Sequence, residues 1–388
     1  MTSPTQLPPS GQPARPHPGM SRRHLLGGAA GIGLVGASLT GMPGVGSRAA
    51  LAAPTEIDGL AVSKIANITG PDITGQFGVH WTDLGIPARC PDGRIFYAFG
   101  DTFGPGRGDD WRAPVGLWSD PTALPAAVTF TGTPGGDFAK QLIGGYRPGD
   151  NPEDNISQII PSDVITLGDT MYMHAVANNG FGNAIWTAIW SSTDNGENWE
   201  DSGARFPIDK YNGTWQHFTW DLGDDGWVYV YSCGFLRETP MIMHRVRPED
   251  ITAPDKYESW GFDDSGWGWG KPASHITDGK YGEASLRRLG DRWVFTWFED
   301  PPEYKIFAQI IDHPTADLRA TPRTMLLRGV NWGEEHDVID VPQLYGSYVI
   351  PGSTLSDLHL AVSQWKTSDD SIYHVMQYRF QGLDALYP

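Results

Sequence analysis

The amino-acid sequence predicts an all-β protein built as a five-bladed β-propeller. The chain of 388 residues is rich in Trp, Tyr, Gly and Pro, with 16 Trp and 48 Gly, and shows little helical periodicity. It also repeats one pattern five times: a short strand, a turn centred on glycine, and a second strand of apolar and aromatic residues.

The five repeated units follow one another along the chain. They cover residues 83–99, 164–176, 216–231, 284–298 and 346–362, and they turn at Gly93, Gly168, Gly226, Gly290 and Gly352. These glycines are 58 to 75 residues apart, which is enough for a four-stranded blade of roughly 40–50 residues and its loops. A β-sandwich or two unrelated β domains are the alternatives, but no linker rich in Pro, Ser or Gly divides the chain.

The N-terminal residues predict an export signal. Residues 21–26 form a twin-arginine pattern, an uncharged glycine-rich stretch runs from Leu25 to Met42, and residues 50–52 form a small-x-small cleavage site. We therefore expect residues 1–52 to be a twin-arginine signal peptide and residues 53–388 to be a propeller domain that is secreted or held in the cell envelope. An N-terminal membrane anchor is the alternative, but this stretch is too rich in glycine for a good spanning helix.

The charge of the chain favours a neutral partner. The formal net charge is −18, and residues 1–52 carry only basic groups, so the remainder is more acidic still. Such a field disfavours nucleic acid and suits a neutral polysaccharide. We expect a monomer with no stable membrane anchor.

The sequence indicates no cofactor. Cys90 and Cys233 fall in different blades, so we expect two free thiols rather than a disulfide. The histidines are scattered singly and show no metal-ligand spacing. Carboxylates are numerous enough for a structural Ca²⁺, but no pattern demands one, and we predict no metal site.

Residues Ser192 to Trp199 fit the Asp-box pattern Ser-x-Asp-x-Gly-x-x-Trp. We expect Asp194 and Gly196 to shape a tight hairpin turn, with Trp199 packed beneath it. Such boxes lie on the outer hairpins of propeller blades, so the expected role is structural.

Two aspartates flank the first predicted hairpin. Asp83 precedes its first strand, Asp101 follows its second, and each lies nine residues from Asp92 in the turn. A plain antiparallel register places the two opposite each other, with Cβ atoms roughly 4.5–5.5 Å apart, whereas a slip of one residue removes this pairing. Two carboxyls so close share a proton near neutrality, which suits glycoside hydrolysis with retention of configuration. The alternative is that both are strand-end aspartates bonded to backbone amides.

The neighbours of the two aspartates predict different roles. Asp101 lies between Phe99 and Phe103, so we expect desolvation to raise its pKa and make it the general acid/base. Asp83 follows Trp81 and Thr82 in more polar company, and we expect it to be the nucleophile.

Residues 81–87 and 94–103 resemble the opening blade of a bacterial family of endo-D-arabinanases, glycoside hydrolase family 183, formerly domain of unknown function 4185. Weaker likeness extends through residues 160–163, 281–285 and 345–348. The resemblance implies a five-bladed propeller that cleaves internal α-linked D-arabinofuranose bonds of mycobacterial arabinogalactan and lipoarabinomannan with retention. It also implies that the catalytic pair is Asp83 and Asp101.

Several residues near the predicted central funnel are expected to bind sugar. They are His80, Trp81, Trp111, Asp163, Tyr281 and Glu283. The two acids begin inner strands and suit structural turns equally well, and most of the tryptophans must serve packing. The aromatic segment 257–271 is expected either to wall the cleft or to pack on its own blade.

Two other functions fit the same sequence. An inverting arabinanase-like hydrolase would use Asp83, Asp163 and Glu283 as base, modulator and acid. A non-catalytic carbohydrate-binding propeller would repeat its binding site in several blades, whereas the aspartate pair occurs only in the first.

Overall fold

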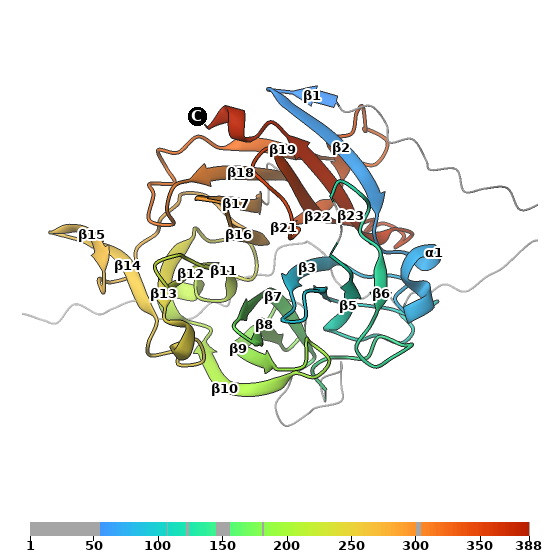
Figure 1. The fold of residues 1–388 in the computed structure, drawn as a ribbon, viewed down its shortest axis with the longest axis horizontal. Coiled ribbons are helices and arrows are strands. Elements are labelled where there is room, and N and C mark those ends of the chain that lie inside the picture. The colour runs from blue at the N-terminus through green and yellow to red at the C-terminus, as the bar shows by residue number, and fades with distance from the viewer. Residues whose placement is uncertain are drawn as a thin grey trace, which may run out of the picture. The chain divides into compact units, whose positions relative to one another are not determined.

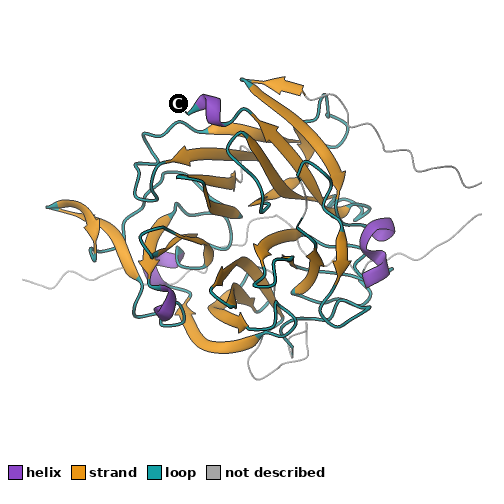
Figure 2. Ribbon diagram, viewed as in Figure 1, coloured by secondary structure: helices purple, strands orange, loops and turns teal. Residues whose placement is uncertain are grey.

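The computed structural model describes residues 55–387 except 107, 122–123, 145–155, 181 and 300–303. The predicted signal peptide therefore lies outside the described residues. Five sheets, antiparallel except for one parallel pair of strands, surround a common centre (Figure 1), and helices are confined to short peripheral turns such as α1 (Pro71–Thr74) (Figure 2). The predicted all-β, five-bladed propeller is confirmed.

Blades 1, 2 and 3 follow one another along the chain, each beginning with its innermost strand. Blade 1 contains β3 (Leu84–Arg89), β4 (Ile95–Phe99), β5 (Val115–Ser119) and β6 (Phe130–Gly132). Blade 2 contains β7 (Gln158–Leu167), β8 (Thr170–Asn178), β9 (Ala184–Ser192) and β10 (Glu200–Pro207). Blade 3 contains β11 (His217–Leu222), β12 (Val228–Cys233), β13 (Ile242–Val246), β14 (Glu258–Asp263) and β15 (Gly266–Trp269).

Blades 4 and 5 complete the ring, and blade 5 combines strands from both ends of the domain. Blade 4 contains β16 (Ala284–Leu289), β17 (Arg292–Glu299), β18 (Lys305–Ile311), β19 (Thr324–Val330) and β20 (Asp340–Pro342). Blade 5 contains β21 (Leu344–Val349), β22 (Asp357–Trp365), β23 (Tyr373–Gln381), β2 (Leu60–Asn67) and β1 (Thr55–Ile57). Because β2 pairs antiparallel with β23, the first long strand closes the ring against the last.

The five predicted strand units are the two innermost strands of each blade. All five predicted turn glycines have positive φ, between 60° and 102°, a backbone region that glycine enters without steric cost. The repeated glycine in the sequence thus marks the tight turn of every inner hairpin.

Side-chain hydroxyls link the inner strands to one another. Backbone amides of Phe218, Leu286 and Val349 donate to the hydroxyls of Ser162, Thr219 and Ser285 on the preceding inner strands, at 3.3, 2.7 and 3.2 Å. At the closing junction the amide of Leu84 donates to Ser363 Oγ at 2.8 Å. These contacts satisfy amides at the free edges of the inner strands, where sheet pairing supplies no partner.

Aromatic packing fills the space between blades. Trp215, Trp220 and Trp297 are fully buried, as expected for most tryptophans of the chain. The hairpin β14–β15 carries the aromatic segment 257–271 and lies at the outer edge of blade 3 (Figure 1). Of the two expectations for this segment, the cleft wall is therefore wrong.

The Asp-box forms the predicted turn between β9 and β10. Asp194 Oδ1 accepts hydrogen bonds from Ser192 Oγ at 2.8 Å and from the amide of Asn198 at 2.9 Å. Trp199 is buried and packs on Phe96 of blade 1, with ring centroids 5.6 Å apart. The box is a structural joint between two blades, as predicted.

Two further sequence predictions concern the cysteines and the membrane. Both cysteines are buried free thiols, as expected. Within the described ranges, no helix has the length and apolar character needed to cross a membrane.

Candidate active site

One face of the ring gathers the polar side chains that begin the inner strands. In blade order these residues are Asp83, Gln158, His217, Glu283 and Tyr345. Each lies within two residues of the start of β3, β7, β11, β16 or β21, the strands that surround the centre in Figure 1. Because neighbouring strands are antiparallel, Asp101 after β4 and Tyr373 at the start of β23 belong to the same face.

The register of the first hairpin differs from the plain one predicted. Pairing from Arg89↔Ile95 to Ile86↔Ala98 follows the expected register, but it then shifts so that Leu84 pairs with Phe99. The amide of Gly100 donates to the carbonyl of Asp83 at 3.3 Å. The prediction that Asp83 directly opposes Asp101 is therefore wrong by one residue, because a β-bulge intervenes.

Left-handed backbone at Leu84 and Gly85, with φ of 66° and 73°, forms this bulge. A non-glycine residue in that region is strained, and such strain often marks a functional site. The bulge sets the Asp83 carboxyl over Gly100, where an added Cβ would lie 2.4 Å from Asp83 Oδ1. Glycine at position 100 thus leaves room for the carboxyl.

Asp83 has a strongly perturbed carboxyl group. Burial, and then the charge of Asp101, raise its pKa to about 7, against the opposing effect of hydrogen bonds from the Tyr373 and Tyr345 hydroxyls. Tyr345 donates to Asp83 Oδ2 at 2.9 Å. The expectation that Asp83 lies in the more polar surroundings is wrong, since burial dominates its environment. The influence of Asp101 shows that the two carboxyls interact despite the bulge.

Asp101 is held by two donors from other parts of the face. Trp111 Nε1 donates to Asp101 Oδ1 at 2.9 Å, and the Gln158 amide donates to the same oxygen at 3.1 Å. N–H donors of this kind stabilise a carboxylate in its charged form. Asp83 is thus the member of the pair whose raised pKa favours the protonated form near neutrality.

Glu283 is the third carboxyl of this face. Its Oε1 atom forms a short ion pair with Arg237, from the β12–β13 loop. Burial alone would raise the pKa of Glu283, but the charge and hydrogen bond of Arg237 outweigh it, and the pKa is lowered. Arg237 lies over the rings of Phe298 and Tyr345, so it links Glu283 to the tyrosine that contacts Asp83.

Comparison with known proteins places the chain in a family. The model of the family described as "Domain of unknown function (DUF4185)" matches residues 69–379. The chain is a DUF4185 protein.

Curated relatives match most of the DUF4185 protein. "Notoamide biosynthesis cluster protein J'" of Aspergillus versicolor is 29% identical over 327 residues, covering 76% of this chain and 84% of the relative. "Uncharacterized 35.9 kDa protein in asd 3'region" of Mycolicibacterium smegmatis is 25% identical over 334 residues, covering 80% of this chain and 95% of the relative.

Solved structures share its fold. A putative hydrolase from Bacteroides ovatus has a TM-score of 0.61 at 15% identity, covering 89% of this chain and 97% of its own. A GH43_1 enzyme from Xanthomonas citri has a TM-score of 0.50 at 11% identity, covering 81% of this chain and 90% of its own. At such identities the likeness concerns the fold.

Asp163 of the DUF4185 protein lies inside the ring rather than on the site face. It is fully buried, and its Oδ2 atom accepts hydrogen bonds from Arg287 at 2.8 Å, Thr219 at 2.8 Å and the amide of Trp220 at 3.1 Å. This environment fits an internal ion pair joining blades 2, 3 and 4. The Asp163 side chain is therefore buried away from any bound sugar.

The four aromatic residues expected to contact sugar lie in different surroundings. Trp111 hydrogen-bonds Asp101 directly. His80 and Trp81 are half-buried, and their backbone amides donate to the carbonyl of Phe103 at 3.1 and 3.5 Å. Tyr281 is buried in the aromatic core, with its ring 5.3 Å from that of Trp297. Trp111 is thus tied to the aspartate pair by a side-chain hydrogen bond.

Sequence reasoning missed four side chains that shape this site: Gln158, Arg237, Tyr345 and Tyr373. Gln158 and Tyr345 could have been found, because they occupy the same strand-start position as Asp83 and Glu283. Arg237 carries no such signal, since it comes from a loop and has a left-handed φ of 61°. Across the described part of the chain, no three His, Cys, Asp or Glu side chains gather as a metal site.

Proposed function

We propose that this protein is a glycoside hydrolase that cleaves internal α-D-arabinofuranosyl linkages of mycobacterial-type arabinogalactan and lipoarabinomannan with retention of configuration. The observation that carries the proposal is the interacting carboxyl pair, in which Asp83 has a pKa of about 7 while Asp101 accepts N–H bonds from Trp111 and Gln158. A proton donor beside a charged carboxylate is what a two-step displacement requires.

In the first step Asp83 acts as the acid and Asp101 as the nucleophile. The Asp83 proton passes to the glycosidic oxygen as the C1–O bond breaks, and an oxygen of Asp101 forms a new bond to C1. In the second step water attacks C1 and gives a proton to the Asp83 carboxylate, while the C1–Asp101 bond breaks. Two inversions at C1 give net retention. These roles reverse the sequence-based expectation, because burial and the charge of Asp101 raise the pKa of Asp83.

The surroundings of the other two acids support this scheme over an inverting one. An inverting acid at Glu283 would need a proton near neutrality, whereas Arg237 holds the pKa of Glu283 low. Asp163, the modulator of that scheme, is fully buried against Arg287. Glu283 instead contributes a fixed negative charge, which helps to raise the pKa of Asp83.

The substrate class rests on the resemblance of the first blade to endo-D-arabinanases and on family membership. The fold neighbours include a putative hydrolase and a GH43_1 enzyme, which agrees with a hydrolase. The acidic chain suits a neutral glycan. Export by the twin-arginine route would bring a monomeric enzyme to this polysaccharide outside the cell or in its envelope.

The direct test is incubation of the wild-type protein with purified mycobacterial arabinogalactan, followed by sizing of the products. We expect a ladder of oligosaccharides, and proton NMR of the first-formed reducing end should show the α anomer. A single released monosaccharide would contradict internal cleavage, and a first-formed β anomer would contradict retention. Full turnover in both Asp83→Asn and Asp101→Asn would overturn the mechanism.

A further inference from the structure

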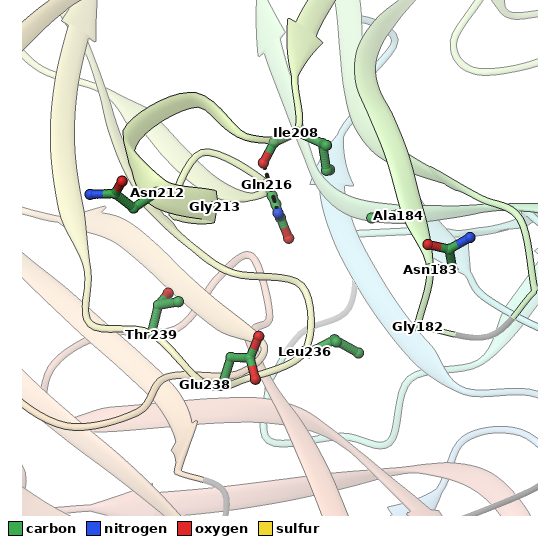
Figure 3. Close-up of a pocket in the computed structure, with 10 residues that line it drawn as sticks. All are labelled: Gly182, Asn183, Ala184, Ile208, Asn212, Gly213, Gln216, Leu236, Glu238 and Thr239. Atoms are coloured by element: carbon green, nitrogen blue, oxygen red, sulfur yellow. Dashed lines mark hydrogen bonds between the residues drawn. The ribbon is translucent and has the colours of Figure 1, made fainter. Parts of the chain in front are cut away.

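A hollow of about 220 Å³ opens between blades 2 and 3 (Figure 3). Its walls come from the β8–β9 turn of blade 2, the connection between β10 and β11, and the β12–β13 loop of blade 3. All three segments border the face that carries Asp83 and Glu283. We call this hollow, lined by residues 182–184, 208, 212–213, 216, 236 and 238–239, the inter-blade pocket.

The β12–β13 loop is a wall shared by the inter-blade pocket and the candidate active site. Arg237 reaches inward to Glu283, while its neighbours Leu236 and Glu238 line the pocket. The left-handed backbone at Arg237 lets its side chain point toward Glu283 while the side chains of Leu236 and Glu238 point into the pocket. The pocket and Glu283 of the candidate active site therefore lie on the two sides of one loop.

Hydrogen bonds hold two of the three walls of the inter-blade pocket in place, the β10–β11 connection and the β12–β13 loop. Gln216 donates from Nε2 to the carbonyl of Ile208 at 2.9 Å and accepts the amide of Phe235 at 2.9 Å. Thr239 Oγ1 accepts the amide of Gly234 at 2.6 Å, which closes the loop on itself. The pocket is thus preorganised, which limits the entropy lost when a ligand binds.

The chemistry of the lining suits one ring of a neutral sugar. Leu236 is 47% exposed and presents an apolar surface to the pocket. Within the described ranges, no group pairs with the exposed carboxylate of Glu238, which leaves it available to accept sugar hydroxyls. Among the described residues that line the pocket there is no Lys or Arg, so these residues offer an anionic ligand no counter-charge. The volume lies below the roughly 300–1,000 Å³ of pockets for drug-sized ligands, as a single ring requires.

We propose that the inter-blade pocket is a subsite that binds one sugar ring of the polysaccharide, remote from the cleaved bond. Glu238 accepts hydrogen bonds from the hydroxyl groups of this ring, and Leu236 packs on its apolar face. This inference rests on the proposed function. It makes Leu236 and Glu238 determinants of the preferred chain length rather than catalytic residues.

The test measures kcat/KM on a series of α-linked D-arabinofuranosyl oligosaccharides of increasing length. For the wild type, kcat/KM should rise when the chain becomes long enough to reach the pocket. Leu236→Ala and Glu238→Ala should each remove most of that rise, a loss of about 10-fold on long chains, while the shortest cleaved oligosaccharide is processed as by the wild type. In an Asp83→Asn background, the same changes should weaken binding of a long oligosaccharide by a similar factor.

A matched control exists at the other end of the same blade junction. Glu249 is also exposed and lines a second hollow on the opposite face, formed where β7, β11 and β13 end. Glu249→Ala should leave the chain-length profile unchanged. If wild-type protein cleaves the series but Leu236→Ala and Glu238→Ala keep its profile, the subsite inference is overturned. If wild-type protein cleaves no member of the series, the proposed function itself fails.

Discussion

Asp83 and Glu283 occupy equivalent positions in the ring, yet they titrate in opposite directions. Each immediately precedes the inner strand of its blade, on the same face and with its carboxyl group buried. The pKa of Asp83 is raised to about 7, whereas that of Glu283 is lowered. Position in the repeat therefore does not determine protonation.

The difference lies in the charge of the side chains that contact each carboxyl group. Arg237 supplies a full positive charge to Glu283, while Asp83 meets the neutral hydroxyl of Tyr345 and the negative charge of Asp101. One site face thus contains a carboxyl that keeps its proton and another that keeps its charge, the separation expected of acid/base machinery. Substitutions at Asp83, at Arg237 or Glu283, and at Tyr345 change these two environments one at a time.

The largest effect is expected for Asp83→Asn, which keeps the shape but removes the transferable proton. Activity on arabinogalactan should fall by about 10³-fold or more. Because the folded-state pKa of Asp83 is raised, wild-type stability declines as pH rises from about 4 to about 7. The variant should lack this decline. The melting temperature of the variant minus that of the wild type should therefore be larger at pH 8 than at pH 5.

Asp163→Asn is the matched control for the Asp83 change. It leaves the buried Arg287 without its charged partner, and the free energy of unfolding should fall by about 3–5 kcal/mol. An Asp83→Asn variant that loses stability in the same way would show that Asp83 serves the fold and would count against its role as an acid.

An intermediate effect is expected for Arg237→Met. Without the guanidinium, burial should protonate Glu283, and the loss of that negative charge should lower the pKa of Asp83. Activity should drop about 10- to 100-fold, and the alkaline limb of the pH–rate profile should move to lower pH. Glu283→Gln should move the alkaline limb in the same direction. Arg237→Lys, which keeps a positive charge, should bring the alkaline limb part of the way back to its wild-type position. A limb that stays in place in both Arg237→Met and Glu283→Gln would break the comparison.

The smallest effect is expected for Tyr345→Phe, which removes one hydrogen bond to the charged form of Asp83. The pKa of Asp83 should rise above 7, so that the variant retains its activity to higher pH, with a maximal rate reduced only a few-fold. The pH–rate profile measures both. A shift of the alkaline limb toward lower pH would contradict the inference that the Tyr345 hydrogen bond lowers the pKa of Asp83.

The propeller could be predicted because its physical cause is repeated locally. Each inner hairpin needs a glycine with positive φ, and five such glycines at regular intervals identify five blades. The aspartate pair was found for the same reason, since both residues belong to one hairpin.

The environment of that pair could not be predicted in the same way. The bulge at Leu84 and Gly85 shifts the register and cannot be recognised from the residue pattern, because leucine rarely adopts a positive φ. Arg237, Tyr345 and Tyr373 reach the site from blades that are distant in sequence. The pKa of Asp83 depends on those distant partners and on its burial, so its neighbours in the sequence could not predict it.

The pairing of β2 with β23 links completion of the fold to chemical competence. Tyr345 and Tyr373, which contact Asp83, belong to the blade that β2 closes. A nascent chain that has finished blade 1 already carries both aspartates, yet it lacks the hydroxyls and the enclosure that set the acidity of Asp83. Hydrolytic capacity would therefore emerge only once the last strand has been synthesised, so a truncated chain would be inert rather than partly active.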